Sequence, residues 1–144
     1  MVIWLKGASV WALFNYPLHT ITSIIKLLTD TKLHVRNIFE PLFKEILESP
    51  KGPCPSDIMP KYISSDFTYH FPNGSQIQMA GTDAGNAEKL RGQKSRLVLV
   101  DEAGFCNNLN YNILSILMPT TTHTGGRMIL ASTPPLEPDH DFIS

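Results

Sequence analysis

The chain has 144 residues, of which 42% are hydrophobic and 17% charged, proportions typical of one ordinary globular domain. Twelve Lys and Arg against thirteen Asp and Glu give a formal net charge of -1, which excludes a protein that coats nucleic acid through a broadly basic surface. The longest early apolar stretch, residues 10–14, is far shorter than a membrane span and no cleavage site follows it, so we expect a soluble, unprocessed protein. Two cysteines, Cys54 and Cys106, cannot make a disulfide framework or a four-cysteine zinc site, which favours an intracellular setting in which they serve packing or lie on the surface.

Short apolar runs at residues 2–5 and 24–28 predict two buried strands, and residues 9–16 predict a helix before Pro17. Between residues 33 and 47, apolar side chains recur every three or four positions, which is typical of an amphipathic helix. Pro41 lies inside this pattern, so the helix either kinks there or begins there. Thr-Asp-Thr just before the pattern has the residue types of a turn that leads into a helix cap. We expect both tryptophans, Trp4 and Trp11, in the core.

Residues 49–60 contain four prolines and predict a surface loop. The hydrophobic period then changes to two, with alternating aromatic residues over 67–71 and alternating apolar residues over 77–79. Asn73-Gly74 lies between them, a combination that predicts an antiparallel hairpin. The aromatic stripe is expected to pack in the core, with base stacking as the alternative.

The polar segment 82–95 predicts an exposed loop with about one helical turn near its middle. Leu-Val-Leu-Val at residues 97–100 is typical of a central parallel strand covered on both faces. Residues 107–118 predict a short helix stopped by Pro119, and residues 128–131 predict another buried strand. The fold class is therefore α/β, a mainly parallel sheet flanked by helices with an inserted antiparallel hairpin, in a single domain over 1–144.

Two adjacent carboxylates, Asp101 and Glu102, directly follow the most apolar strand. In an open α/β sheet the ligand crevice lies outside the carboxyl ends of the strands. There, one carboxylate can hold Mg²⁺ while its neighbour orients, or accepts a proton from, the attacking water of a phosphoryl transfer. Taken alone, the same pair can equally begin a solvent loop.

Two hydroxyls, Ser132 and Thr133, follow the next predicted strand about thirty residues later and can hydrogen-bond a terminal phosphate. An ordinary exit from a strand into a turn would look the same. Arg91 beside Gly92 precedes the acidic strand and can reach a phosphate as a planar fork of donors, in the same subunit or a neighbour. A solvated loop arginine is the alternative.

These segments, in this order, resemble the ATPase domain of large terminase subunits, the DNA-packaging motors of tailed bacteriophages. The segments are Phe-Pro-Asn-Gly-Ser-Gln-Ile-Gln-Met-Ala-Gly at 71–81, Leu-Arg-Gly at 90–92, Leu-Val-Leu-Val-Asp-Glu-Ala-Gly-Phe at 97–105, and Ile-Leu-Ala-Ser-Thr-Pro at 129–134. The ordered match covers about residues 66–135, and a weaker likeness extends back to about residue 31.

The resemblance implies a RecA-like P-loop NTPase fold, present here as an incomplete domain without the family's nuclease domain. It implies ATP hydrolysis coupled to DNA translocation, with ATP and Mg²⁺ as cofactors. The implied roles are Asp101 as the Walker B magnesium ligand, Glu102 as the catalytic carboxylate, Ser132 and Thr133 as the coupling motif that contacts the nucleotide, and Arg91 as a trans-acting finger. The implied partners are double-stranded DNA, a portal protein, the terminase small subunit and further copies in a ring, in the host cell cytoplasm and without a membrane.

One departure bears on activity, because no G-x-x-x-x-G-K-[ST] string that would cradle phosphates occurs in the sequence. Lys-Gly-Ala-Ser at residues 6–9 stands where this loop is expected but is too short. An inactive binding or assembly module is therefore an alternative to an ATPase, and a helicase-like nucleotide-dependent enzyme is another. Asp-His-Asp at residues 139–141 is expected to be a solvated terminus rather than a metal site.

Overall fold

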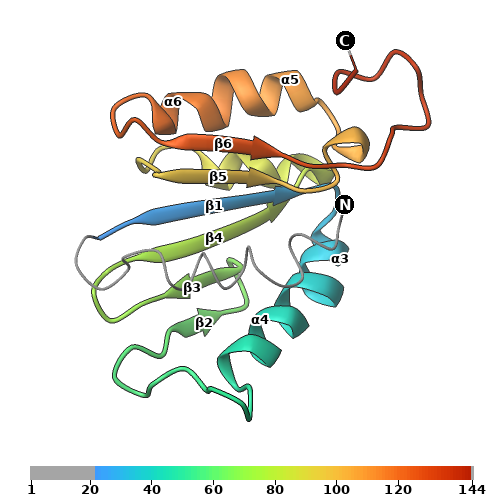
Figure 1. Ribbon diagram of the computed structural model, residues 1–144. Coiled ribbons are helices and arrows are strands. Elements are labelled where there is room, and N and C mark those ends of the chain that lie inside the picture. The colour runs from blue at the N-terminus through green and yellow to red at the C-terminus, as the bar shows by residue number, and fades with distance from the viewer. Residues whose placement is uncertain (1–21, 144) are drawn as a thin grey trace.

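The computed structural model describes residues 22–143, which form one six-stranded sheet with helices on both faces (Figure 1). The spatial order of the strands is β2-β3-β4-β1-β5-β6. Strands β4, β1, β5 and β6 run parallel to one another, while β2, β3 and β4 form an antiparallel meander. The strands are β1 (Ile24–Thr29), β2 (Lys61–Ile63), β3 (Thr68–His70), β4 (Gln76–Gly81), β5 (Leu97–Val100) and β6 (Arg127–Leu130). The predicted sheet with its inserted hairpin is confirmed.

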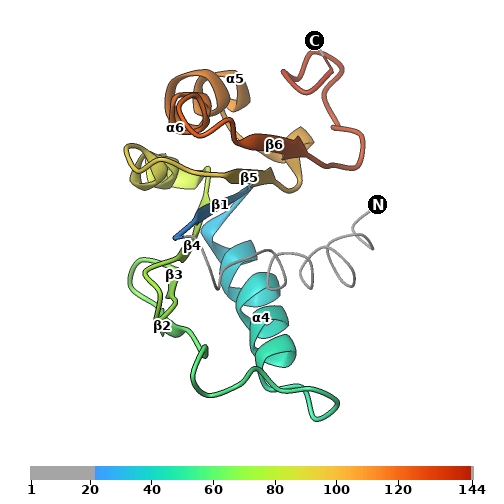
Figure 2. The same cartoon turned by 60° about the vertical axis from the view of Figure 1, so that its left-hand side comes forward.

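The helical segments lie on opposite sides of this sheet, with α4 on one side and α5 and α6 on the other (Figure 2). Within residues 22–143, no helix is long and apolar enough to cross a bilayer. The strand expected at residues 2–5, the helix expected at 9–16 and both tryptophans lie outside the described residues. The helical segments are α3 (Lys32–His34), η1 (Val35–Phe39), α4 (Glu40–Leu47), η2 (Asp83–Leu90), η3 (Ala103–Phe105), α5 (Leu109–Tyr111), η4 (Asn112–Leu117) and α6 (Met118–Thr121).

Alternation of side chains along the central strand β1 divides the core into two apolar clusters. Ile25 and Leu27 pack on the α4 side, in one cluster with Phe43. Leu28 points to the other face and belongs to the cluster that includes Ile116 from η4. Because successive side chains of a strand alternate between faces, a strand that is apolar throughout requires helices on both sides.

Both helices that contain an internal proline continue through it. Pro41 lies in the first turn of α4, directly after the π-helical η1, and Pro119 lies in the first turn of α6, directly after the π-helical η4. The expectation that Pro119 stops its helix is wrong, since α6 extends to Thr121. A proline needs no N–H acceptor, and a π-helical turn already departs from the regular hydrogen-bond ladder, so the proline is accommodated there.

The structure differs from the expectations in four further segments. The helical turn expected within residues 82–95 is present as the 3₁₀ helix η2, but this helix buries Ala87 and Leu90, so the segment is not an exposed loop throughout. Strand β6 is not buried, because it is the edge strand of the described sheet and the side chain of Ile129 is 52% exposed. Strand β2 was not expected, since three residues are too few to show a hydrophobic period. The terminal segment also packs back, with the Asn110 N–H donating to the Asp141 carboxylate at 3.1 Å.

Lys26 is the charged residue of β1, and its side chain is fully buried. Its ammonium group donates to the carbonyl oxygens of Leu90 at 2.6 Å and Gln93 at 2.5 Å. Burial lowers the pKa of Lys26 to about 8, because removal from water disfavours the charged form.

We expect this lowered pKa to appear in the pH dependence of stability. Between about pH 8 and the ordinary lysine value of 10.5, the unfolded chain binds more protons at Lys26 than the folded chain does. In that window this group raises the free energy of unfolding by up to about 1.4 kcal/mol per pH unit. Urea denaturation of the wild type and of Lys26→Met across this range measures the difference, from which the titrations of other groups cancel. A difference that does not change with pH would contradict the expectation.

Candidate functional site

Four parallel strands end at the same side of the sheet, which we call the carboxyl edge. Strands β5 and β6 are paired there with Val100 opposite Leu130. The pairing continues past the strands, because the Ala131 N–H donates to the Val100 carbonyl at 2.9 Å and the Ala103 N–H donates to the Ala131 carbonyl at 3.1 Å. Residues 101–102 and 132–133, 31 positions apart in sequence, therefore emerge side by side, as expected.

Asp101 is held in place at the carboxyl edge by its neighbours. Its side chain is buried, and its N–H donates to the Leu28 carbonyl of β1 at 2.8 Å. Burial raises the pKa of its carboxyl group, and the charges of Glu102 and Asp30 add to this rise, whereas a hydrogen bond to the Glu102 backbone and the nearby His34 oppose it. A buried carboxylate with few partners is poised to gain from a cation.

Glu102 occupies the left-handed backbone region, with φ 51° and ψ 42°. This conformation is uncommon for a residue with a side chain and costs on the order of 1 kcal/mol. It reverses the chain direction directly after β5 and leads into η3, so Asp101 and Glu102 do not continue one extended strand. Such strain is typical of functional sites.

Ser132 ties the two strand ends together. Its Oγ accepts a hydrogen bond from the Gly104 N–H at 2.8 Å, and its hydroxyl donates to the Thr133 carbonyl at 2.6 Å. A Cβ at Gly104 would lie 2.9 Å from this Oγ, so the close approach requires glycine. Thr133 is exposed. Of the two hydroxyls predicted to meet a phosphate, one is already bonded within the protein and the other faces solvent.

His34 and Asp30 also lie at the carboxyl edge, where the sequence did not predict them. His34 Nδ1 lies 3.3 Å from Asp30 Oδ1, and its Nε2 lies 3.9 Å from Asp101 Oδ2. Asp30 follows β1 just as Asp101 follows β5, which is the signal that could have identified it. The helix cap predicted for residues 29–31 is confirmed, because Thr31 Oγ1 accepts a hydrogen bond from the His34 N–H at 3.1 Å.

Arg91 is not brought to the carboxyl edge of its own chain. Its guanidinium donates to the Glu88 carboxylate at 2.9 Å and to the Ser115 carbonyl at 2.8 Å, and it contacts the Tyr111 hydroxyl at 3.2 Å. Hydrogen bonding to Arg91 lowers the pKa of Glu88. These groups lie at the surface of η2 and η4, so the structure gives Arg91 different partners from those of Asp101.

The described residues contain no cluster of three or more His, Cys, Asp or Glu side chains that could hold a metal ion by themselves. Magnesium sites need fewer protein ligands, since one or two carboxylates with water and phosphate oxygens suffice. Cys106 is buried beneath the edge, and burial raises its pKa to about 12, so it serves packing.

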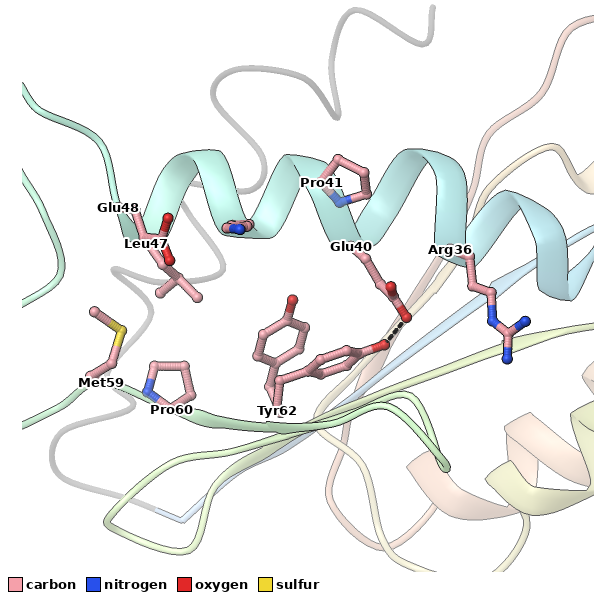
Figure 3. Close-up of a pocket in the computed structure, with 10 residues that line it drawn as sticks. Arg36, Glu40, Pro41, Leu47, Glu48, Met59, Pro60 and Tyr62 are labelled. Atoms are coloured by element: carbon pink, nitrogen blue, oxygen red, sulfur yellow. Dashed lines mark hydrogen bonds between the residues drawn. The ribbon is translucent and has the colours of Figure 1, made fainter.

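A pocket of about 580 Å³ lies away from this edge, between α4 and the strands β2 and β3 (Figure 3). In it the Tyr62 hydroxyl donates to the Glu40 carboxylate. Burial, with this hydrogen bond, raises the pKa of Tyr62. None of the acidic or hydroxyl residues of the carboxyl edge lines it, so the pocket is separate from the candidate site.

Ser132→Ala is expected to lower the free energy of unfolding by about 1–3 kcal/mol, because the buried Gly104 N–H loses its acceptor. Thr133→Ala is the matched control, with an expected change within about 0.5 kcal/mol because its side chain is exposed. Urea denaturation of both variants tests this. Equal effects would show that the Ser132 hydroxyl does not hold the two strand ends together.

Comparison with solved structures identifies the fold. The large terminase ATPase domain of Thermus phage P74-26 superimposes with a TM-score of 0.65 at 17% sequence identity, covering 88% of this chain and 53% of that chain. At this identity the likeness shows the fold alone, which is the RecA-like fold of terminase ATPase domains.

Sequence comparison identifies the family. "Tripartite terminase subunit 3" of human herpesvirus 2 (strain HG52) and of human herpesvirus 1 (strain 17) are each 29% identical over 104 residues. That match covers 64% of this chain but only 14% of the length of either relative. The family described as "Terminase large subunit, T4likevirus-type, N-terminal" matches residues 3–144. The chain therefore belongs to the terminase large subunit family, and its described residues have the fold of the family's ATPase domain.

Proposed function

We propose that this chain supplies part of a magnesium-dependent ATPase site that drives translocation of double-stranded DNA into a viral capsid. The observation that carries the proposal is the adjacency of Asp101, Glu102 and Ser132 at the ends of the parallel strands β5 and β6. Ligands of open parallel sheets bind outside these ends. The solved relative is itself described as a large terminase ATPase domain, which supports nucleotide use at this edge.

Each residue has a role that suits its position. Asp101 would hold Mg²⁺, a cation that prefers carboxylate oxygen, and burial keeps competing water away from it. When bound, Mg²⁺ supplies neutralisation of charge on phosphate oxygens. Glu102 would orient the attacking water and accept its proton. Thr133, which is exposed, and Ser132, once its hydroxyl leaves the Thr133 carbonyl, would donate to the terminal phosphate.

Arg91 would act on the site of a neighbouring copy in a ring. It is exposed, and its present partner Glu88 forms a surface ion pair with it at 2.9 Å. Because solvent screens an exposed pair of this kind, exchange of Glu88 for a phosphate costs little. A planar guanidinium matches the geometry of phosphate oxygens.

The sequence contains no segment that fits the phosphate-binding loop of a P-loop ATPase. No G-x-x-x-x-G-K-[ST] string is present in the sequence. This observation favours a second candidate function, an inactive module that keeps the sheet and hairpin for assembly with a portal protein, a terminase small subunit or DNA. The herpesvirus relatives are named as subunits of a tripartite terminase, which supports partners of this kind. We propose the host cell cytoplasm as the setting of this assembly.

Binding and turnover of ATP by this chain distinguish the two candidate functions. If the site is active, the wild type binds ATP with Mg²⁺, and Asp101→Asn weakens that binding because it removes a metal-ligand charge. Glu102→Gln retains binding and lowers turnover by about a hundredfold or more, because a general base is lost. Calorimetric titration and phosphate release measure the two properties.

Lys89→Met serves as a control in the same assays, since the Lys89 ammonium donates to the Asp66 carbonyl and lies over the Phe67 ring. If the wild type shows no binding at millimolar ATP, the ATPase is excluded for this chain and the assembly module stands. Binding that Asp101→Asn leaves unchanged would place the nucleotide elsewhere.

A further inference from the structure

The fully buried Lys26 has no role in the proposed ATPase chemistry. Together with Asp101, it is one of two charged side chains buried among residues 22–143. An apolar residue at this position of β1 would avoid the cost of removing an ammonium group from water. The hydrogen bonds of the Lys26 ammonium group therefore indicate why a lysine occupies this buried position.

The two acceptors of Lys26 lie at the last residue of η2 and in the short connection between η2 and β5. The Leu90 carbonyl at 2.6 Å and the Gln93 carbonyl at 2.5 Å stand on either side of Arg91 and Gly92. Gly92 has φ +105°, a conformation that side chains other than glycine rarely adopt. One ammonium group thus closes a tight turn that has Arg91 at its tip.

A second contact reinforces the attachment of this turn to the sheet. The Gln78 side chain of β4 donates to the Gln93 side chain at 2.6 Å. On the other side, the Arg91 N–H donates to the Glu88 carbonyl at 3.0 Å. The backbone of Arg91 is therefore held from both sides, whereas its guanidinium has only surface partners.

We propose that Lys26 is a positioning residue for Arg91. It fixes the backbone from which the guanidinium projects, so that the side chain alone moves when Arg91 changes partners. The functional part rests on the proposed function, in which Arg91 reaches a phosphate bound by a neighbouring copy. Met has a similar length and fills the same space but donates no hydrogen bond, so Lys26→Met separates positioning from packing.

The first experiment needs no nucleotide. In Lys26→Met, hydrogen exchange of the Arg91 amide rises by about tenfold or more, and the Arg91 Nε–H resonance moves towards that of a free arginine. The Ser95 amide, which donates to the Thr120 carbonyl at 2.8 Å, stays protected as an internal control. Lys89→Met, which removes a neighbouring ammonium group that donates to the Asp66 carbonyl instead, changes neither Arg91 signal. A folded Lys26→Met with unchanged Arg91 signals would overturn the proposal.

A measurement on the wild type covers the case in which Lys26→Met does not fold. The Lys26 ammonium protons are expected to be protected and to show through-bond coupling to the carbonyl carbons of Leu90 and Gln93. A freely exchanging, uncoupled ammonium group would overturn the proposal without any variant.

The second experiment tests the functional part by turnover. Lys26→Met and Arg91→Ala each lower kcat by about tenfold or more at unchanged KM for ATP, and the double variant is no slower than Arg91→Ala. Additive losses, or a changed KM, would show that Lys26 does not act through Arg91. If the wild type shows no turnover, the proposed ATPase fails, whereas the exchange and resonance measurements still decide whether Lys26 positions Arg91.

Discussion

The pairing of β5 with β6 is the interaction on which the candidate site depends. The two strands leave Asp101 and Ser132 at one edge because they run parallel and in register, with Val100 opposite Leu130. Hydrogen bonds through Ala131 extend the ladder past the strands, and Ser132 then bonds Gly104 on the far side of Glu102. Parallel strands require a long crossover, which η3, α5, η4 and α6 provide here. The site is therefore a consequence of sheet topology.

Several features near the functional residues reduce stability. Asp101 and Lys26 are charged side chains taken out of water, and Glu102 adopts a strained backbone conformation. The two apolar clusters, one on each face of the sheet, offset these costs. Each of these residues has a role in the proposed function. Asp101 would hold the cation, Glu102 would orient the attacking water, and Lys26 positions the turn that carries Arg91. This arrangement is expected of a protein in which function and stability compete.

The sequence predicted those elements whose pattern is local. The hairpin on either side of Asn73-Gly74 and the aliphatic strand before Asp101 are confirmed, because turn chemistry and alternation depend only on neighbouring residues. The helix end at Pro119 was wrong, because a π-helical turn before the proline removes the conflict that would stop a regular helix. Burial of β6 was also wrong, because an edge strand and a central strand can have equally apolar sequences.

The sequence by itself determined which functional groups are available: two carboxylates after one apolar strand, two hydroxyls after another, and a family resemblance that links them. What only the tertiary structure decided is which of these groups meet. His34 lies between Asp30 and Asp101. Lys26 donates a hydrogen bond to the turn that carries Arg91, more than sixty positions away in sequence, and Arg91 forms an ion pair with Glu88. Such contacts depend on strand order and on the face to which each side chain points, and residue spacing along one chain specifies neither.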